Sequence, residues 1–394
     1  MSATNPLLPE IDFARDDLPD LHDVLEDLRR EGPVVSVNYH GAPVWLILGY
    51  EELQQAFLDQ DHFDMGEGYR QMVEEPLGRN IMTMSGAEHR LHRNIVTAPF
   101  QPGVIRSHIE PLIEPVAMEI SDRIAAEREV DLVAAFTRPY PFSIITRMLG
   151  IPVRDEERFL EWAVKLFDFP WDPQGAMRAK AQFDSYMVPI IEERRAAPGE
   201  DMLSALTQAE SEGRRLDNEQ VLTFLRLLFP AGSDTTFKVA GSMFAAVLSD
   251  PAVRDVALSG KAGREAVVAE ALRWQPPTAL LPRMASADVD FAGKPIRRGD
   301  WMLFGITAAN SDPKKFPDPR RFDPSRNNRD TITFGRGPHF CLGLHLAKRE
   351  LEIALQVVLE RFPQMALVPG RPVEFVSGVL RGPRDLWVWP YGEK

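Results

Sequence analysis

The feature that most constrains the fold is a long run with the pattern of a single helix. It begins at Asp217, an N-cap residue, and Gln220 three positions later completes a capping box. Apolar residues continue to about Leu248, and Asp250-Pro251 ends the run. At the helical rise per residue, ~32 residues make a helix of ~48 Å. A helix this long predicts a mainly helical fold built around it.

The middle of this helix has unusual chemistry. Residues 230–236 read Pro-Ala-Gly-Ser-Asp-Thr-Thr. In a helix interior Gly costs about 1 kcal/mol and Pro about 3 kcal/mol relative to Ala, and threonine hydroxyls can bond back to the preceding turn. One interpretation is a kink in a core helix. The other is a groove beside a cofactor, with Asp234 and Thr235 at its edge, because local departures from helix rules concentrate at functional sites.

The rest of the chain predicts a mainly α protein with small β sheets, organised as one domain over residues 1–394, because no shift in composition marks a boundary. Residues from about 51 to 272 are mostly helical in pattern, and a further helix is expected from about Leu342 to Arg361. Strands are expected in three β-rich portions, at about 34–48, 283–307 (with turns at Gly293 and Gly299) and 364–390.

Charge and cysteine content exclude several classes of protein. The chain has 45 basic and 58 acidic residues, and a net charge of -13 disfavours nucleic acid and anionic membranes. No apolar run approaches the ~20 residues of a membrane span, and Met1 to Asp17 lacks the pattern of a signal peptide. A single cysteine excludes intrachain disulfides and multi-cysteine metal sites. We therefore expect a cytoplasmic protein, and a monomer.

That cysteine, Cys341, lies in a glycine-rich frame from Phe334 to Gly343 that leads into an apolar helix. Three glycines in ten residues predict a tightly bent backbone that a bound ligand can approach closely. Amides and the dipole at the helix N-terminus would favour a thiolate. With one thiolate available, the other ligands of a metal must come from elsewhere, and a porphyrin supplies four. The alternative is a small buried hydrophobic side chain, as for most free cysteines.

The frame Phe-Gly-x-Gly-x-His-x-Cys-x-Gly resembles the haem-binding loop of the cytochrome P-450 superfamily in its bacterial form. The Gly-Ser-Asp-Thr-Thr run resembles the oxygen-activation motif of the same superfamily, although Pro230 departs from the commonest pattern. The resemblance implies the P-450 fold, with haem b (iron protoporphyrin IX) between the long helix and the cysteine-loop helix. It makes Cys341 the iron ligand. It also implies that Thr235 holds water near the dioxygen and that Asp234 relays protons.

Further positions match the family's pattern in the expected order. Glu270-x-x-Arg273 and Arg321 resemble a buried network that holds the core around the haem, a role in folding. Phe334 and Gly343 would pack against the cofactor in the ligand loop. Four basic residues match contacts to the haem propionates, although each alone could equally be a surface residue: His89, Arg93, Arg283 and His339.

The resemblance implies a soluble monooxygenase that inserts one atom of O2 into a hydrophobic small molecule, such as a terpenoid, an alkyl-aromatic or a steroid. No flavin or iron–sulfur segment is fused to the chain, so we expect a ferredoxin and an NAD(P)H-dependent reductase to supply electrons. The candidate docking residues are Arg90, His92, Arg336 and Lys348. The expected substrate pocket comprises a loop from Met65 to Met82, residues 167–171, the helix near Leu228, and residues 278–281 and 377–379.

Three alternatives remain open at this stage. The same fold could serve a peroxygenase or a nitric oxide reductase, although a peroxygenase needs no proton relay and so leaves the Asp234-Thr235 pair unexplained. A non-enzymatic haem carrier or gas sensor gains nothing from that pair either. A chain without haem would keep Cys341 as a core side chain. Efficient turnover with peroxide alone would favour the peroxygenase. Unchanged coupling in Thr235→Ala would favour a carrier or sensor. A red-shifted Soret band of the reduced, CO-bound protein would exclude a chain without haem.

Overall fold

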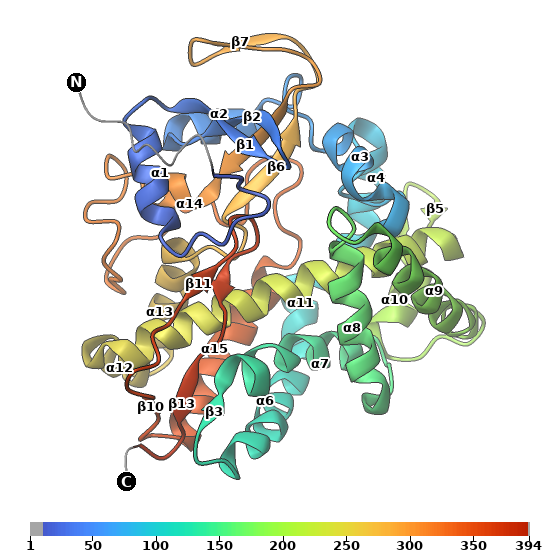
Figure 1. Cartoon of the computed structure of the whole chain (residues 1–394). Coiled ribbons are helices and arrows are strands. Elements are labelled where there is room, and N and C mark those ends of the chain that lie inside the picture. The colour runs from blue at the N-terminus through green and yellow to red at the C-terminus, as the bar shows by residue number, and fades with distance from the viewer. Residues whose placement is uncertain (1–10, 393–394) are drawn as a thin grey trace.

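The long helix is the axis of the structure. The computed structural model describes residues 11–392, and α11 (Asn218–Ser249) crosses the whole molecule (Figure 1). The carboxylate of Asp217 accepts a hydrogen bond from the Gln220 amide at 2.8 Å, and the Gln220 side chain accepts one from the Asp217 amide at 3.0 Å. This reciprocal cap confirms the predicted start of the helix, and Asp250 is its C-cap, as the sequence indicates. Pro230 lies inside it without interrupting it.

Helices make up most of the described chain. The α-helices besides α11 are α1 (Leu21–Arg29), α2 (Tyr50–Leu58), α3 (Met65–Leu77), α4 (Gly86–Thr97), α5 (Pro102–Val104), α6 (Glu110–Ala125), α7 (Pro139–Met148), α8 (Glu156–Phe167), α9 (Pro173–Ala196), α10 (Met202–Gln208), α12 (Pro251–Leu258), α13 (Lys261–Trp274), α14 (Ile306–Asn310) and α15 (Leu344–Arg361). Short 3-10 or π segments are η2 (Ala98–Phe100), η3 (Ile105–Ile109), η4 (Val133–Thr137) and η5 (Val153–Asp155).

The strands form one larger sheet and several small ones. The largest has the order β1-β2-β9-β6, with β2 and β9 parallel and the other two pairs antiparallel. Its strands are β1 (Val34–Tyr39), β2 (Ala42–Ile47), β6 (Leu280–Met284) and β9 (Trp301–Gly305). The remaining strands are β3 (Val130–Asp131), β4 (Glu210–Ser211), β5 (Arg214–Arg215), β7 (Val289–Phe291), β8 (Lys294–Ile296), β10 (Ala366–Leu367), β11 (Phe375–Val376), β12 (Gly382–Pro383) and β13 (Trp387–Trp389).

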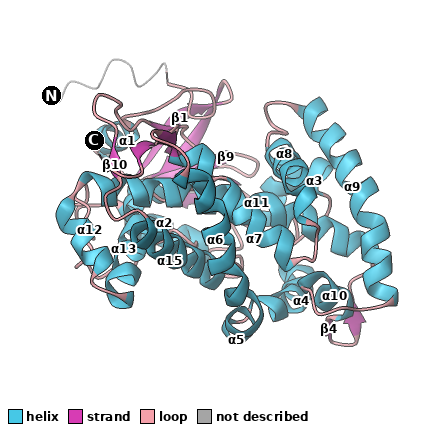
Figure 2. Cartoon of the chain, turned by 90° about the horizontal axis from the view of Figure 1, so that it is seen from below, coloured by secondary structure: helices cyan, strands magenta, loops and turns pink. Residues whose placement is uncertain are grey.

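The arrangement places α11 between two groups of elements. Figure 2 shows the large sheet on one side and helices α8 and α9 on the other. Along its length α11 packs against α7, α8 and α9, and also against α13 and α15. Apolar side chains from these helices form the main hydrophobic core, and two smaller apolar clusters lie around the large sheet. The cysteine-loop helix α15 therefore lies beside the long helix.

Three details differ from the sequence-based expectations. The segment from Met65 is the helix α3 as far as Leu77, rather than a loop. Strand β3 and the β4–β5 hairpin interrupt the region expected to be helical. The sequence Gly41-Ala42-Pro43 suggests the turn of the first hairpin, but the turn is formed by His40 and Gly41, both with positive φ. The hairpin itself, the strands at 283–307 and the final helix are confirmed.

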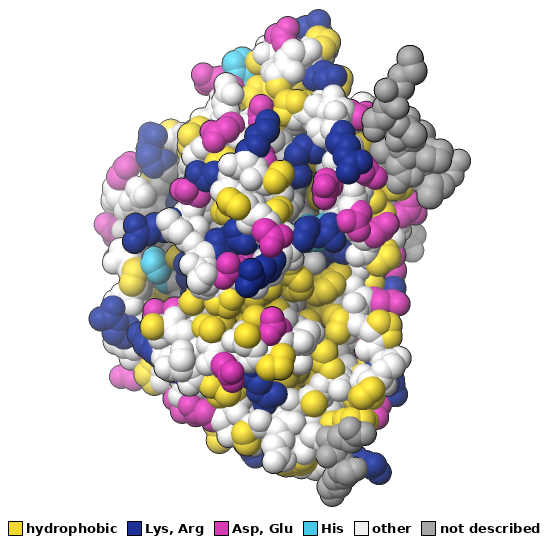
Figure 3. Space-filling model, turned by 90° about the vertical axis from the view of Figure 1, so that its left-hand side faces the viewer, with side chains coloured by type: hydrophobic (Ala, Val, Ile, Leu, Met, Phe, Trp, Pro, Cys, Tyr) yellow, Lys and Arg dark blue, Asp and Glu magenta, His cyan; other side chains and the backbone are white. Residues whose placement is uncertain are grey.

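The surface carries both charged and apolar side chains. On the face shown in Figure 3, basic and acidic side chains are interspersed around a band of hydrophobic ones. Among residues 11–392, no helix is both long enough and apolar enough to cross a membrane.

Candidate active site

A large cavity separates the long helix from the cysteine loop. It encloses about 1410 Å³ of space free of protein atoms, part of it open to solvent. Its wall is drawn from segments far apart in the sequence, and it is mostly apolar. On one side lie residues of α11 such as Leu228, Ala231 and Thr235, and on the other lie Cys341 and the first turns of α15.

The cysteine loop is shaped by glycines at defined places. Gly337 has a φ of 74°, and a side chain there would place its Cβ 2.9 Å from the carbonyl oxygen of Phe57. The Cys341 amide donates a hydrogen bond to the Phe334 carbonyl at 3.0 Å, which closes the loop. At Gly343 a Cβ would meet no atom within 4 Å, so this residue leaves open space beside the cysteine.

The electrostatics of Cys341 differ in part from the expectation. The amides of Gly343 and Leu344 at the start of α15 do lower the pKa of the thiol, as predicted from its place before a helix. Burial acts in the opposite direction and is the larger effect, so the pKa of Cys341 is raised overall. The loop alone therefore does not hold a thiolate. A bound metal cation would, because coordination deprotonates a thiol.

The structure separates the two residues expected to act together on α11. Thr235 lines the cavity with Ala231 and Gly232, and its hydroxyl donates a hydrogen bond to the Ala231 carbonyl at 2.8 Å. Asp234 is not among the described residues that line the cavity. Its carboxylate accepts a hydrogen bond from Lys238 Nζ at 2.7 Å, one turn along the helix. Thr235 and Cys341 thus face the same space, while Asp234 is held outside it.

Four basic residues from three segments lie close together beside the cavity, and three of them, Arg93, Arg283 and His339, line it. The rings of His89 (α4) and His339 lie 3.9 Å apart. Burial, with the nearby cations, lowers the pKa of His89 to about 4 and that of His339 to about 3. Burial also lowers the pKa of Arg93 and of Arg283. Within the described chain none of the four forms an ion pair with a carboxylate at 4 Å or less, although the charge of Asp64 acts on His89 and Arg283. No direct ion pair therefore neutralises this cluster.

These features together fit a haem group. The buried Arg283 and the partly buried Arg93 suit two propionates, because charges removed from water need a counter-charge, and the neutral imidazoles of His89 and His339 can donate hydrogen bonds to the same groups. The open space at Gly343 and the apolar wall suit a flat, hydrophobic macrocycle. Cys341 lines the same cavity, and its thiolate could ligate the iron.

The predicted structural network is present, with one correction. Glu270 and Arg273 form a fully buried bidentate pair, with nitrogen–oxygen distances of 2.6 and 2.9 Å. Arg321 is exposed and contributes only its backbone carbonyl, which accepts from Arg273 at 3.2 Å. The second guanidinium beside Glu270 belongs to Arg326, whose Nε lies 3.4 Å from the carboxylate. The predicted side-chain role of Arg321 is therefore wrong, because the irregular segment turns Arg326 inward instead.

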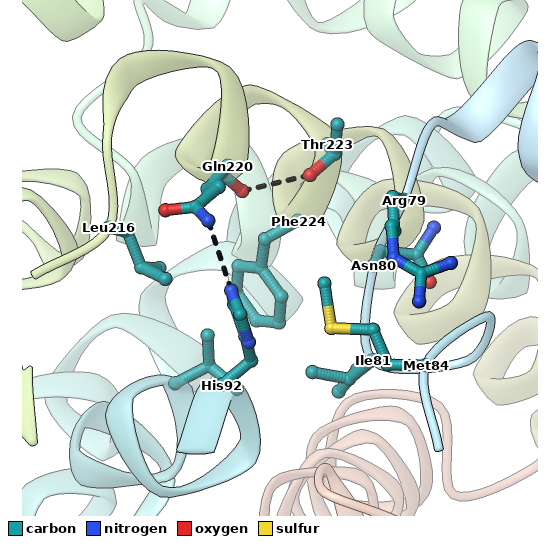
Figure 4. Close-up of a pocket in the computed structure, with 10 residues that line it drawn as sticks. Arg79, Asn80, Ile81, Met84, His92, Leu216, Gln220, Thr223 and Phe224 are labelled. Carbon is teal, nitrogen blue, oxygen red and sulfur yellow. Dashed lines mark hydrogen bonds between the residues drawn. The ribbon is translucent and has the colours of Figure 1, made fainter. Parts of the chain in front are cut away.

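His92 does not present its imidazole as the docking hypothesis requires. Its Nδ1 lies 3.0 Å from the Glu88 carbonyl oxygen, and its Nε2 lies 3.1 Å from Gln220 Nε2. Figure 4 shows this ring among the residues that line a small pocket between α4 and the start of α11. Gln220 thereby serves both the cap of α11 and the packing of α4. Of the other docking candidates, Arg90 is exposed, and Arg336 and Lys348 are partly exposed.

The expected substrate segments are only partly in the wall. Met65, Met82, Leu228, Thr278 and Leu281 line the cavity. Residues 167–171 and 377–379 are not among the described lining residues. Trp171 instead is half exposed, and its indole N–H donates to the Ala14 carbonyl at 3.1 Å.

Sequence reasoning missed several residues of the wall, and two of them bear on the chemistry of the site. Glu350 on α15 is buried and lines the cavity, and burial raises its pKa well above the ordinary value. Its position four residues after Leu346 places it on the apolar face of that helix, a signal that was available in the sequence. Phe57, from α2, also lines the cavity, and its aromatic ring lies near the Arg283 guanidinium. No local pattern marks that contact.

Comparison with known proteins gives the same assignment. The cytochrome P450 family model matches residues 13–257 and 264–378. The chain is 31% identical to the cytochrome P450 monooxygenase PikC of Streptomyces venezuelae, over 97% of this chain and 93% of that protein. It is 32% identical to the erythromycin C-12 hydroxylase of Saccharopolyspora erythraea, over 88% of each chain.

Solved structures agree with the fold. The cytochrome P450 PksS of Bacillus subtilis superposes with a TM-score of 0.87 at 29% identity, covering 95% of this chain and 97% of that one. CYP109E1 from Bacillus megaterium in complex with testosterone superposes with a TM-score of 0.84 at 27% identity, covering 93% of this chain and 98% of that one. With the cavity, the cysteine loop and the cationic cluster in place, these matches show that the chain belongs to the cytochrome P450 family and is a haem-dependent monooxygenase.

Proposed function

We propose that the protein hydroxylates an uncharged, hydrophobic small molecule. The observation that carries this is the apolar cavity between Thr235 and Cys341. Its charged lining residues are Arg93 and Arg283, which belong to the cationic cluster, and Glu350, which burial favours in the neutral form. A charged substrate would therefore lack a partner there.

The printed names of similar proteins support the same substrate class. CYP109E1 was solved with testosterone and with corticosterone, and other relatives are named as hydroxylases of erythromycin and of 6-deoxyerythronolide B. Bulky, largely apolar molecules of the steroid, terpenoid or macrolide kind are thus the first compounds to test.

Each site residue has a defined part in this proposal. When bound, haem would supply the iron on which dioxygen is activated, and the Cys341 thiolate would ligate that iron. His89, Arg93, Arg283 and His339 would hold the propionates by charge-assisted hydrogen bonds. Phe334 and Gly343 line the space where the macrocycle would lie.

Proton delivery would use the two neighbouring residues of α11 in different ways. The Thr235 hydroxyl donates to Ala231, so its oxygen is left to accept a hydrogen bond from water in the cavity. Asp234 is the acid next to Thr235 in the sequence, and it pairs with Lys238 outside the cavity. We propose that Asp234 passes protons to the Thr235 side when this ion pair opens.

Electrons would come from a ferredoxin and its NAD(P)H-dependent reductase. The surface over the cysteine loop supports a protein partner there, because Phe340 is 36% exposed and Leu58 is 58% exposed. Arg90, Arg336 and Lys348 supply the basic character that an acidic ferredoxin would need.

The test combines binding with turnover. Compounds of the classes above are screened by the low-to-high-spin shift of the ferric haem, and the best binder is incubated with NADH, ferredoxin and reductase. Hydroxylated product that depends on all three components is the expected result. Efficient turnover with peroxide alone would overturn the proposal in favour of a peroxygenase, and binding confined to charged compounds would overturn the substrate class.

A further inference from the structure

Arg226 is a buried arginine that contacts three elements at once. It lies on α11 and is 2% exposed. Its Nε donates to the Asp184 carboxylate of α9 at 2.6 Å, and its Nη2 donates to the Glu219 carboxylate, two turns earlier on α11, at 3.2 Å. Its Nη1 donates to the Leu77 carbonyl, at the end of α3, at 3.4 Å. One guanidinium therefore joins α3, α9 and α11, and two carboxylates balance its charge.

The end of α3 depends on side chains from other helices. The last carbonyls of a helix have no partner within it, and cations are favoured near them. The Leu77 carbonyl accepts from Arg226, and the Glu75 carbonyl accepts from Lys180 Nζ of α9 at 2.8 Å. Gly78, whose φ is 76°, lets the chain turn directly over the guanidinium, because a Cβ there would lie 2.9 Å from Nη1. The direction in which the chain leaves α3 is thus set at Arg226.

The turn after α3 carries this anchor into the wall of the cavity. Asn80 is 3% exposed, its Nδ2 donates to the Gly78 carbonyl, and its Oδ1 accepts from the Met82 amide, both at 2.9 Å. This side chain links the two ends of the turn. Ile81 and Met82 line the cavity, and Figure 4 shows Asn80 and Ile81 near Phe224 of α11. The position of these two wall residues therefore follows from where α3 ends.

Arg226 also lies at the weakest turn of α11. Proline has no amide hydrogen, so Pro230 cannot donate to the Arg226 carbonyl four residues earlier. Leu227 and Leu228, which lie between the two, line the cavity. The guanidinium ties this turn to α9 and α3 through side-chain hydrogen bonds, at the place where one backbone hydrogen bond is missing. Two parts of the wall thus share one anchor.

We propose that Arg226 is a positioning residue that fixes the wall of the substrate cavity formed by Ile81, Met82 and the adjoining turn of α11. It is not among the described residues that line the cavity, so it acts through the end of α3 and through α9. The inference rests on the proposed function in taking this cavity as the site of a hydrophobic ligand. It names the residue that sets how closely the wall fits that ligand.

The test compares two nitrogen ligands of the ferric haem in the holoprotein. Imidazole needs little more than access to the iron, whereas the apolar ring of 4-phenylimidazole also packs against the wall. We expect 4-phenylimidazole to bind the wild type more tightly, as measured by the Soret shift. In Arg226→Gln its Kd should rise on the order of tenfold, as for the loss of one hydrogen bond to a charged group, while the Kd of imidazole stays unchanged.

Arg194→Gln is the matched control. The Nε of Arg194 on α9 pairs with Asp201 at 2.7 Å, but this pair joins α9 to the start of α10, and neither residue is among the described residues that line the cavity. Its Kd values for both ligands should equal those of the wild type. Asp184→Asn changes the more exposed partner of Arg226. It should also raise the Kd of 4-phenylimidazole, and it decides the question by the same criterion if Arg226→Gln does not fold.

Amide hydrogen exchange gives an independent measurement of the same anchor. Residues 78–82 should exchange faster in Arg226→Gln, while exchange of α6 stays unchanged. Unchanged exchange at 78–82, wild-type affinity for 4-phenylimidazole, an equal rise in Arg194→Gln or an equal loss of imidazole affinity would each overturn the inference. Equal affinity of the wild type for the two ligands would do so as well. Both ligands bind the iron whatever the natural substrate is, so a failure of the proposed hydroxylation would leave this result in place.

Discussion

At the scale of single residues, neighbours in the chain receive different tasks because a helix separates them. Successive residues of α11 point about 100° apart, since the helix has about 3.6 residues per turn. Thr235 therefore faces the cavity, while Asp234 points to Lys238 on the outside. The sequence motif names both residues, but only the geometry shows that one touches the reaction space directly.

Replacing Thr235 by Ala should uncouple electron consumption from hydroxylation. The change removes the hydroxyl that would hold water in the cavity and leaves the apolar wall intact. We expect NADH oxidation to continue, with peroxide released and product per NADH reduced on the order of a hundredfold, at the low end of what a positioned proton donor contributes. Product and peroxide are measured in the same reaction. Thr235→Ser should retain most of the coupling, and unchanged coupling in Thr235→Ala would contradict the role.

Two arginines of the irregular segment should differ sharply in their effect on stability. Arg326 is 11% exposed and its guanidinium lies beside the buried carboxylate of Glu270, so Arg326→Ala should lower the free energy of unfolding by about 1–3 kcal/mol. Arg321→Ala keeps the backbone carbonyl that accepts a hydrogen bond from Arg273. It should change the free energy of unfolding by less than about 0.5 kcal/mol. Urea denaturation of both holoproteins checks this. Equal losses would show that the side chain of Arg321 also takes part.

These residues show how far sequence patterns reach within the site. The cysteine frame and the Glu270-x-x-Arg273 spacing are local, so the resemblance to the family's motifs could point to them. Arg326 lies in an irregular segment, where no repeat tells which side chain turns inward. Arg226 meets Leu77 only because α11 packs on α3, a contact between segments more than a hundred positions apart in the sequence.

At the scale of elements, termini and turns decide what could be predicted. The long helix was predictable because Asp217, Gln220 and Asp250 mark its ends. Strand β3 was not, because its two residues pair with β13 near the other end of the chain. Helix α3 contains two glycines near its start and a proline near its end, which obscure its pattern. Packing against β6 and the side-chain cap from Asp64 stabilise it nevertheless.

The cysteine loop should be more sensitive to a methyl group than an ordinary turn. Gly337 and Gly293 have nearly equal φ values, 74° and 73°, so Ala at either position costs about 1–2 kcal/mol of backbone strain. Only at Gly337 would the new Cβ press on a backbone carbonyl, at 2.9 Å, and at Gly293 it meets nothing within 4 Å. We expect Gly337→Ala to lower haem content and Gly293→Ala to preserve it. The haem-to-protein absorbance ratio measures the difference, and equal haem content in the two variants would contradict the argument.

At the scale of the whole molecule, the N-terminal helix is joined to distant parts of the chain around a buried histidine. His22 on α1 is 8% exposed, and the charges of Arg320, Arg381 and Arg273 all act on it. Burial, followed by these cations, lowers the pKa of His22 from 6.5 to about 3. The neutral imidazole is thus the form compatible with the folded protein, and protonation favours unfolding.

The sign of the resulting pH dependence follows from proton counts. Between about pH 3 and 6.5 the unfolded chain binds a proton at His22 that the folded protein does not, so stability falls as the pH is lowered through this range. The contribution of this one residue approaches about 1.4 kcal/mol per pH unit at 25 °C. His22→Gln, a neutral side chain of similar size, should leave stability at pH 7.5 comparable and reduce its loss between pH 6 and 5. Urea denaturation of both holoproteins at these three pH values measures the difference. Parallel pH profiles for the two proteins would show that the acid sensitivity of the molecule arises at other groups, since every other titrating residue is common to both.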